Sequence, residues 1–166
     1  MITQLSLFQE RQSSHPVQRR NDVRAGDAAE AFVIAKLLKW GYDAHGARRD
    51  LPYDVVVDVG EGQICRVQVK GRRQADRGAW SFRAIRGNWR SATGTYAYTE
   101  TDYDVSAFVA LSLEKVMFVS GVHASFRAAT ADFMREDVEE QSWVRALAAF
   151  RGKTTLNAGR QVAFYE

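Results

Sequence analysis

Residues 53–71, YDVVVDVGEGQICRVQVKG, consist of two short apolar runs joined by a turn that two glycines frame. The runs at 55–59 and 64–69 are rich in valine and isoleucine, which is typical of β-strands. The intervening residues 60–62, Gly-Glu-Gly, suit a tight reversal of the chain. The stretch therefore predicts an antiparallel hairpin at the centre of a sheet.

Three polar residues, Asp54, Gln68 and Lys70, interrupt this apolar hairpin. Residues two apart on a strand face the same side, so Gln68 and Lys70 are neighbours on one surface. A turn centred on 60–62 pairs Asp54 with Gln68 or Lys70 across the ladder. We therefore expect the three side chains to lie together.

An aspartate, an amide oxygen and a lysine together fit metal-dependent phosphodiester hydrolysis. The carboxylate and the amide carbonyl are hard oxygen ligands for Mg²⁺. A lysine can orient or deprotonate a water molecule and offset charge in the transition state. Glu30, in the preceding segment, is the candidate for a further carboxylate. Taken singly, each of these residues is also explained as an ordinary solvated side chain, and only their shared register favours a site.

The remaining elements are predicted from their apolar patterns. Residues 24–43 form a helix with Ala29, Val33 and Leu37 at helical spacing, closed by Gly41. Residues 1–22 show no sustained period and are expected to form an N-terminal arm, leaving 23–166 as a single domain. Further elements are expected as follows: a short edge strand and loop in 42–52, strands at 80–85, 105–111 and 115–122, a helix within 130–150, and a short edge strand in 159–166. This order indicates a mixed α/β domain with a central sheet.

Charge is concentrated in one part of the chain. The net charge is only +3, but Arg66 to Arg90 holds eight basic residues and one acidic residue. Such a run is either a solvated basic face or a binding surface for a polyanion such as nucleic acid. Trp80 and Trp89 are interleaved with it and fit either core packing or base contacts, whereas Trp40 and Trp143 are expected in the core.

Other classes of protein are disfavoured by what the sequence lacks. The single cysteine, Cys65, excludes an intramolecular disulfide and fits a reducing compartment. The sequence has no Walker loop, no GxGxxG, no Cys/His spacing for zinc and no run of membrane-spanning length. We therefore expect a cytoplasmic protein, associated with the nucleoid when bound to DNA.

The polar residues also match a known family. Glu30 in a helix, PYD at 52–54 and QVKG at 68–71 resemble the PD-(D/E)XK nuclease superfamily. The chain is most similar to the group I intron-associated endonucleases, in which glutamine replaces the acidic residue of the (D/E)XK triplet. The similarity runs from about residue 26 to residue 119.

This resemblance implies an α/β fold with a restriction-endonuclease-like core, a central mixed β-sheet flanked by helices. It implies that Glu30, Asp54 and Gln68, together with Val69, bind Mg²⁺, for which Mn²⁺ can substitute, and that Lys70 is the catalytic lysine. Two additional site residues are suggested by a tyrosine and an aspartate that the group tends to have before a buried strand: Tyr98 and Asp104. Phosphate contacts are then expected from the arginines that follow the catalytic strand: Arg72, Arg73, Arg77, Arg83, Arg86 and Arg90.

The expected function is that of a Mg²⁺-dependent endonuclease that hydrolyses phosphodiester bonds in duplex DNA, as homing endonucleases do. Two alternatives stay open at this point: a Holliday-junction resolvase of the same fold acting on branched DNA, and a non-catalytic nucleic-acid-binding module on a degenerate nuclease fold. Cutting both strands with one site per chain needs two copies, so a homodimer or homotetramer is expected.

Overall fold

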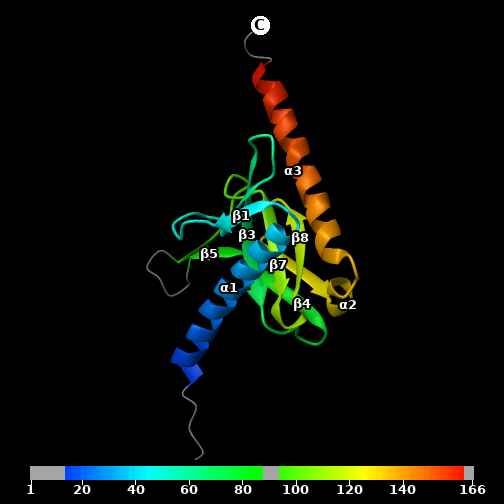
Figure 1. The fold of residues 1–166 in the computed structure, drawn as a ribbon. Coiled ribbons are helices and arrows are strands. Elements are labelled where there is room, and N and C mark those ends of the chain that lie inside the picture. Colours follow the sequence, from blue (N-terminus) through cyan, green and yellow to red (C-terminus); the bar gives the residue numbers. More distant parts are fainter. Residues whose placement is uncertain (1–13, 88–93, 163–166) are drawn as a thin grey trace, which may run out of the picture.

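The computed structural model describes residues 14–87 and 94–162, with side chains in 24–86 and 94–153. Two long helices and a five-stranded sheet form its main body (Figure 1). In chain order the elements are α1 (Ser14–Lys39), β1 (Asp43–Gly46), β2 (Val55–Asp58), β3 (Ile64–Arg72), β4 (Ala79–Arg83), β5 (Ile85–Gly87), β6 (Thr95–Ala97), β7 (Val105–Ala110), a 3₁₀ turn (Leu111–Leu113), β8 (Lys115–Ser120), β9 (Ser125–Ala129), α2 (Thr130–Phe133) and α3 (Val138–Val162).

The central sheet has the strand order β1-β2-β3-β7-β8. Neighbouring strands are antiparallel except β3 and β7, which are parallel, so the sheet is mixed. Two smaller two-stranded sheets, β4–β9 and β5–β6, accompany it. The expected central mixed sheet with flanking helices is confirmed.

The predicted hairpin is also confirmed, as β2 and β3. Val55 pairs with Val67 and Val57 pairs with Cys65, a register that places Asp54 opposite Gln68. The Asp54 amide donates to the Val67 carbonyl at 2.9 Å, which continues the backbone pairing one residue beyond the strand.

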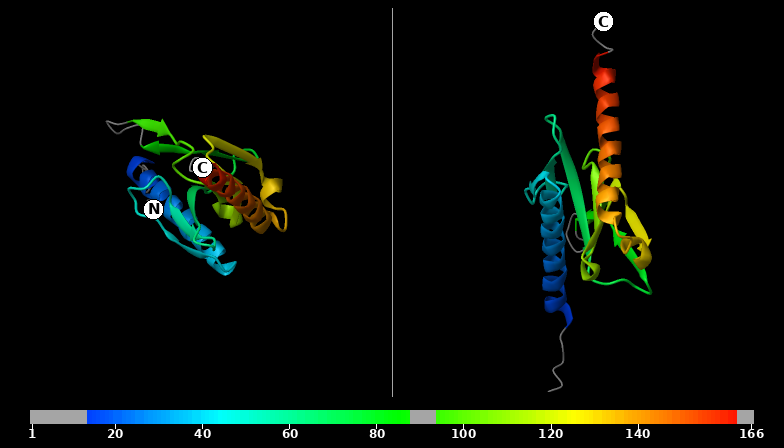
Figure 2. Two further views of the ribbon diagram at one scale, coloured as in Figure 1. Left: turned by 90° about the horizontal axis from the view of Figure 1, so that it is seen from above. Right: turned by 45° about the vertical axis from the view of Figure 1, so that its right-hand side comes forward.

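The two faces of the sheet are covered differently. Both long helices pack on one face, where α1 contributes Val33 and Leu37 and α3 contributes Trp143 and Leu147 to a core with the valines of β2 and β3. The opposite face carries the β4–β9 ribbon and α2, whose aromatic side chains pack around Phe108 of β7. Figure 2 shows α1 and α3 from two further directions, with their free ends pointing away from each other.

Helix α1 begins earlier than its apolar pattern predicts. Residues 14–22, expected in an N-terminal arm, are helical, and this part extends past the sheet (Figure 1). The helix ends as expected, because Gly41 has a φ of +88°, a left-handed conformation that stops the helix. Neither this helix nor any other among the described residues is long and apolar enough to cross a membrane.

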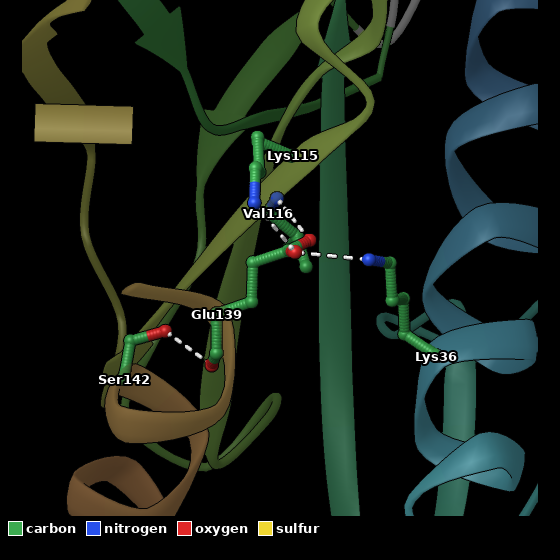
Figure 3. A network of polar contacts seen from close by, with 5 residues as sticks. All are labelled: Lys36, Lys115, Val116, Glu139 and Ser142. Atoms are coloured by element: carbon green, nitrogen blue, oxygen red, sulfur yellow. Dashed lines mark hydrogen bonds and ion pairs between the residues drawn. The ribbon is translucent and has the colours of Figure 1, made fainter. Parts of the chain in front are cut away.

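A buried glutamate joins the two long helices to the sheet. Glu139 of α3 is 7% exposed, and one of its carboxylate oxygens lies 2.9 Å from Nζ of Lys36 and 3.3 Å from Nζ of Lys115 (Figure 3). Its other oxygen accepts the backbone N–H of Val116 at 3.1 Å. Glu139 thereby fixes α3 to α1 and to the edge strand β8.

Two expected strands differ in the structure. The strand expected at 80–85 is divided between β4 and β5, and β4 lies outside the central sheet. Residues 159–162, expected in an edge strand, are the end of α3, and 163–166 lie outside the described residues.

The tryptophans that the structure describes are packed in the interior. Trp80 and Trp143 are each 1% exposed, and Trp40 packs against the core from its edge. Core packing is therefore the role of Trp80, while Trp89 lies outside the described residues.

Candidate active site

Asp54 lies directly before β2 and is held through both its backbone and its side chain. Its carbonyl accepts the Ala47 amide at 2.8 Å. Its carboxylate oxygen Oδ2 accepts the backbone N–H of Val69 at 2.8 Å and a hydrogen bond from the Gln68 side chain. The hairpin register thus brings this carboxylate to the Gln68 side chain, as the sequence predicted.

Gln68 presents its amide group between two oxygens. The residue is only 3% exposed, and its Nε2 contacts Asp54 Oδ2 and lies 3.3 Å from the Val69 carbonyl oxygen. Two potential oxygen ligands, the Asp54 carboxylate and the Val69 carbonyl, therefore converge on the end of the Gln68 side chain. Rotation of the amide by half a turn would bring its own oxygen to the same place.

Lys70 is half-buried on the same face of β3 as Gln68. Its ammonium lies over the ring of Tyr98, 5.5 Å from the ring centre. Burial lowers the pKa of Lys70 below its ordinary value, while the nearby carboxylates of Asp54 and Glu30 act in the opposite direction. The net effect is an amine that gives up its proton more readily than a solvated lysine does.

Glu30 reaches this group from α1. The approach depends on Gly71, because a Cβ placed there would lie 2.6 Å from Cβ of Ala29 and 3.1 Å from the carbonyl oxygen of Ala25. The helix therefore contacts the strand directly at the residue after Lys70, which brings Glu30 to the end of the hairpin. This role of Gly71 was not anticipated, although a glycine within a strand often indicates close backbone approach.

Burial disfavours the charged forms of both carboxylates. Burial first, and then the repulsion of Asp54, raise the pKa of Glu30, which Arg49 and Lys70 only partly oppose. Burial also raises the pKa of Asp54, against the hydrogen bond from Val69 and the charge of Lys70. A bound cation would relieve both effects. The contribution of Arg49 was not anticipated from sequence.

The donor set consists of two carboxylates, one amide and one backbone carbonyl. Among the described residues, no three His, Cys, Asp or Glu side chains gather into a metal-binding group. A set of this kind, made of oxygen ligands, suits Mg²⁺ or Mn²⁺ and does not suit zinc.

Of the two additional residues suggested by resemblance, the structure places only Tyr98 with the others. Tyr98 lies over Lys70 and against Tyr103, whose ring centre is 5.1 Å away. Burial, with a contribution from Asp54, raises the pKa of Tyr98 to about 12, so its hydroxyl stays protonated. Asp104 instead binds Arg66, with Oδ1 at 2.9 Å from Nη2 and Oδ2 at 2.8 Å from the backbone N–H.

The arginines expected to bind DNA are spread along the segment that follows β3. Arg72 donates to the Ser81 carbonyl at 2.7 Å, and Arg86 donates to the Asp50 carbonyl at 3.3 Å. Three others are exposed: Arg73 after β3, Arg77 in the turn before β4, and Arg83 at the end of β4. Arg90 lies outside the described residues.

Comparison with known proteins agrees with this arrangement. Residues 20–152 match the family model described as PD-(D/E)XK endonuclease. The fold is similar to that of the bacterial homing endonuclease I-Ssp6803I, with a TM-score of 0.59 and 21% sequence identity over 79% of this chain and 97% of that one. No curated protein matches the chain.

Proposed function

The chain belongs to the PD-(D/E)XK endonuclease family and has a restriction-endonuclease-like fold, and from this premise we propose that it is a Mg²⁺-dependent endonuclease acting on duplex DNA. The observation that carries the proposal is the convergence of Asp54, Gln68 and Lys70 of the hairpin segment with Glu30 of α1. A structural hairpin has no need for this convergence, since each group costs free energy to bury.

The metal ligands in this proposal are the carboxylates of Glu30 and Asp54, the Gln68 amide and the Val69 carbonyl. The raised pKa values of both carboxylates support it, because burial disfavours their charged forms and a bound divalent cation would stabilise those forms. When bound, the divalent ion supplies a Lewis acid that polarises the scissile phosphate.

Lys70 is proposed to handle the proton of the attacking water. Its lowered pKa gives a larger neutral fraction near neutral pH, and Nζ of the neutral amine accepts the proton as the oxygen attacks phosphorus. The ammonium formed in this step lies near Asp54 and Glu30, whose charges stabilise it. Tyr98 covers the amine and limits its contact with solvent.

The substrate is proposed to be held by the arginines that follow β3. Contacts from Arg72, Arg73, Arg77 and Arg86 with phosphates would position the duplex and weaken steeply with salt. The described residues form one such site, so cleavage of both strands is proposed to use a homodimer or homotetramer.

The test is cleavage of supercoiled plasmid, linear duplex and four-way junctions in Mg²⁺, in Mn²⁺ and in EDTA. We expect cleavage of duplex DNA that needs the divalent ion and is abolished in Lys70→Met. Lys39→Met, which removes an equal charge from an exposed position on α1, is the matched control and should cleave like wild type.

Other outcomes point to other activities. Strong preference for the four-way junction would indicate a resolvase. Metal-independent DNA binding without cleavage under any divalent ion would indicate a binding module. Equal cleavage by Lys70→Met and wild type would contradict the proposed site.

A further inference from the structure

The β4–β9 ribbon has one apolar face and one basic face. Register pairs Ser81 with Arg127 and Arg83 with Ser125. These four residues are all exposed, and they alternate along each strand with Trp80, Phe82, Phe126 and Ala128, which face the sheet. The outward face is thus a two-by-two patch of two arginines and two serines.

The apolar face anchors the ribbon firmly to the central sheet. The ring of Phe126 stacks on that of Phe108, with centres 4.3 Å apart and planes 7° from parallel, and Phe82 lies 5.2 Å from the same Phe108 ring. Trp80 packs against Phe133 of α2 and donates from Nε1 to the Thr130 hydroxyl at 3.1 Å. The outward patch is therefore presented by a rigid element.

The ribbon lies next to the candidate active site. Phe108 is the register partner of Lys70 in the parallel pair β3–β7, so the ribbon covers the same face of the sheet that carries Gln68 and Lys70. Arg72, two residues after Lys70, donates to the Ser81 carbonyl at 2.7 Å and ties the end of β3 to the ribbon.

The charge of the patch is not neutralised within the described part of the chain. The side chains of Arg83 and Arg127 have no hydrogen-bond or ion-pair partner among the described residues, and the segments 79–83 and 125–129 contain no acidic residue. The closest carboxylates in sequence are Asp76 and Asp132, and Asp132 accepts the Ala129 N–H at 2.9 Å. Two unpaired guanidiniums on a rigid two-stranded ribbon suit an anionic partner with a groove.

We propose that the β4–β9 ribbon enters the major groove of duplex DNA beside the cleaved phosphate, and that Arg83 and Arg127 contact base edges there. This inference rests on the proposed DNA cleavage and adds to it an element that reads sequence. The major groove of B-form DNA accommodates a two-stranded ribbon, and a guanidinium pairs with the O6 and N7 acceptors of guanine. The narrow major groove of an RNA duplex does not admit such an element.

The test is selection from a duplex DNA library with a randomised segment, using Lys70→Met so that bound DNA is not cut. We expect enrichment of a defined sequence that includes guanines. Adding Arg83→Ala and Arg127→Ala should remove the preference at particular positions and weaken binding to the selected site by about tenfold or more. Adding Arg145→Ala, an exposed arginine on α3 at the opposite face of the sheet, should change neither.

Replacement of the selected guanines by 7-deazaguanine, which removes the N7 acceptor, should weaken binding of Lys70→Met and leave the arginine variants unaffected. Circular dichroism spectra and thermal midpoints equal to those of the parent would show that the variants are folded. The inference is overturned if sequence preference survives the loss of both arginines, if no sequence is enriched, or if duplex RNA of the same sequence binds as tightly. Failure of the proposed cleavage would appear separately, as wild-type protein that binds the selected DNA without cutting it.

Discussion

Gly71 and Ala29 are in direct contact, so that a Cβ built at Gly71 would lie 2.6 Å from the Cβ of Ala29. Gly71 follows Lys70 on β3, and Ala29 precedes Glu30 on α1. This close contact between strand and helix therefore sets the distance between Lys70, which is proposed to accept a proton, and Glu30 on the helix.

Gly71→Ala should separate α1 from β3. The added methyl meets Ala29 and the Ala25 carbonyl, and overpacking of this kind costs about 1–3 kcal/mol. We expect a lower urea midpoint and a larger loss of cleavage than of DNA binding, because Glu30 moves away from Asp54. Gly26→Ala is the matched control, since a Cβ there meets nothing within 4 Å. It should stabilise the helix by up to about 1 kcal/mol, and unchanged cleavage by Gly71→Ala would contradict the role of the contact.

Glu30→Gln should raise the stability of the protein at neutral pH. The pKa of Glu30 is raised in the folded protein, so ionisation of this carboxyl disfavours folding at every pH above its ordinary pKa. Below that pKa the group is protonated in both states and the penalty is absent. Thermal midpoints measured from acidic to neutral pH should therefore coincide for variant and wild type in acid and diverge as pH rises. A variant less stable than wild type at neutral pH would show that Glu30 contributes favourable contacts instead.

Cleavage should increase with pH until Lys70 has lost its proton. Because the pKa of Lys70 is lowered, the rise should level off below the pKa of a solvated lysine. At acidic pH, protonation of Asp54 and Glu30, whose pKa values are raised in the metal-free protein, should compete with Mg²⁺ binding, so activity should be lost earlier at limiting Mg²⁺ than at saturating Mg²⁺. Single-turnover rates at both Mg²⁺ concentrations would give the profile. Lys70→Arg retains the charge but does not release a proton near neutral pH, and full activity in this variant would exclude Lys70 as the base.

Glu139→Gln should destabilise the fold through the two lysines that it leaves unpaired. The amide oxygen can still accept the Val116 N–H, but Lys36 and Lys115 lose their shared counter-charge. Since both lysines keep some contact with solvent, we expect a loss of about 1–3 kcal/mol in urea unfolding. Glu140→Gln, at the exposed neighbouring position, removes the same charge and should change stability by less than about 0.5 kcal/mol. Equal effects of the two substitutions would show that the buried network contributes nothing specific.

The sequence predicted the hairpin and the contact between Asp54 and Gln68 because both depend on local rules. Period-two alternation and a short glycine-framed turn determine which residues lie opposite one another, and Asp54 meets Gln68 as the spacing indicates. The position of Glu30 near them was expected from the resemblance, and the structure supplies the reason for it in the Gly71 contact.

Features that depend on distant segments were not predicted. The ribbon pairs β4 with β9, and β9 consists of small and polar residues around one phenylalanine, with no strong apolar alternation. The start of α1 was not predicted because its first residues extend past the sheet (Figure 1). Residues that do not pack on a core need no apolar side chains at helical spacing, so the sequence shows no helical pattern there. Leu38 of α1 and Val144 of α3 are apolar yet 51% and 55% exposed, because each helix buries a narrower stripe than its apolar residues suggest.

The Asp104–Arg66 pair joins β3 to β7 where their parallel pairing begins. The Asp104 carboxylate accepts a hydrogen bond from the backbone N–H of Arg66, and the backbone N–H of Asp104 donates to the Arg66 carbonyl at 2.9 Å. The regular pairing of the two strands then begins with Val67 and Val105. A slip of one residue at this point would turn Gln68 and Lys70 toward the helices and Val69 toward the ribbon. Asp104 thus helps to set the register of β3 against β7, and with it the face of the sheet on which Gln68 and Lys70 lie, while its own carboxylate is engaged by Arg66.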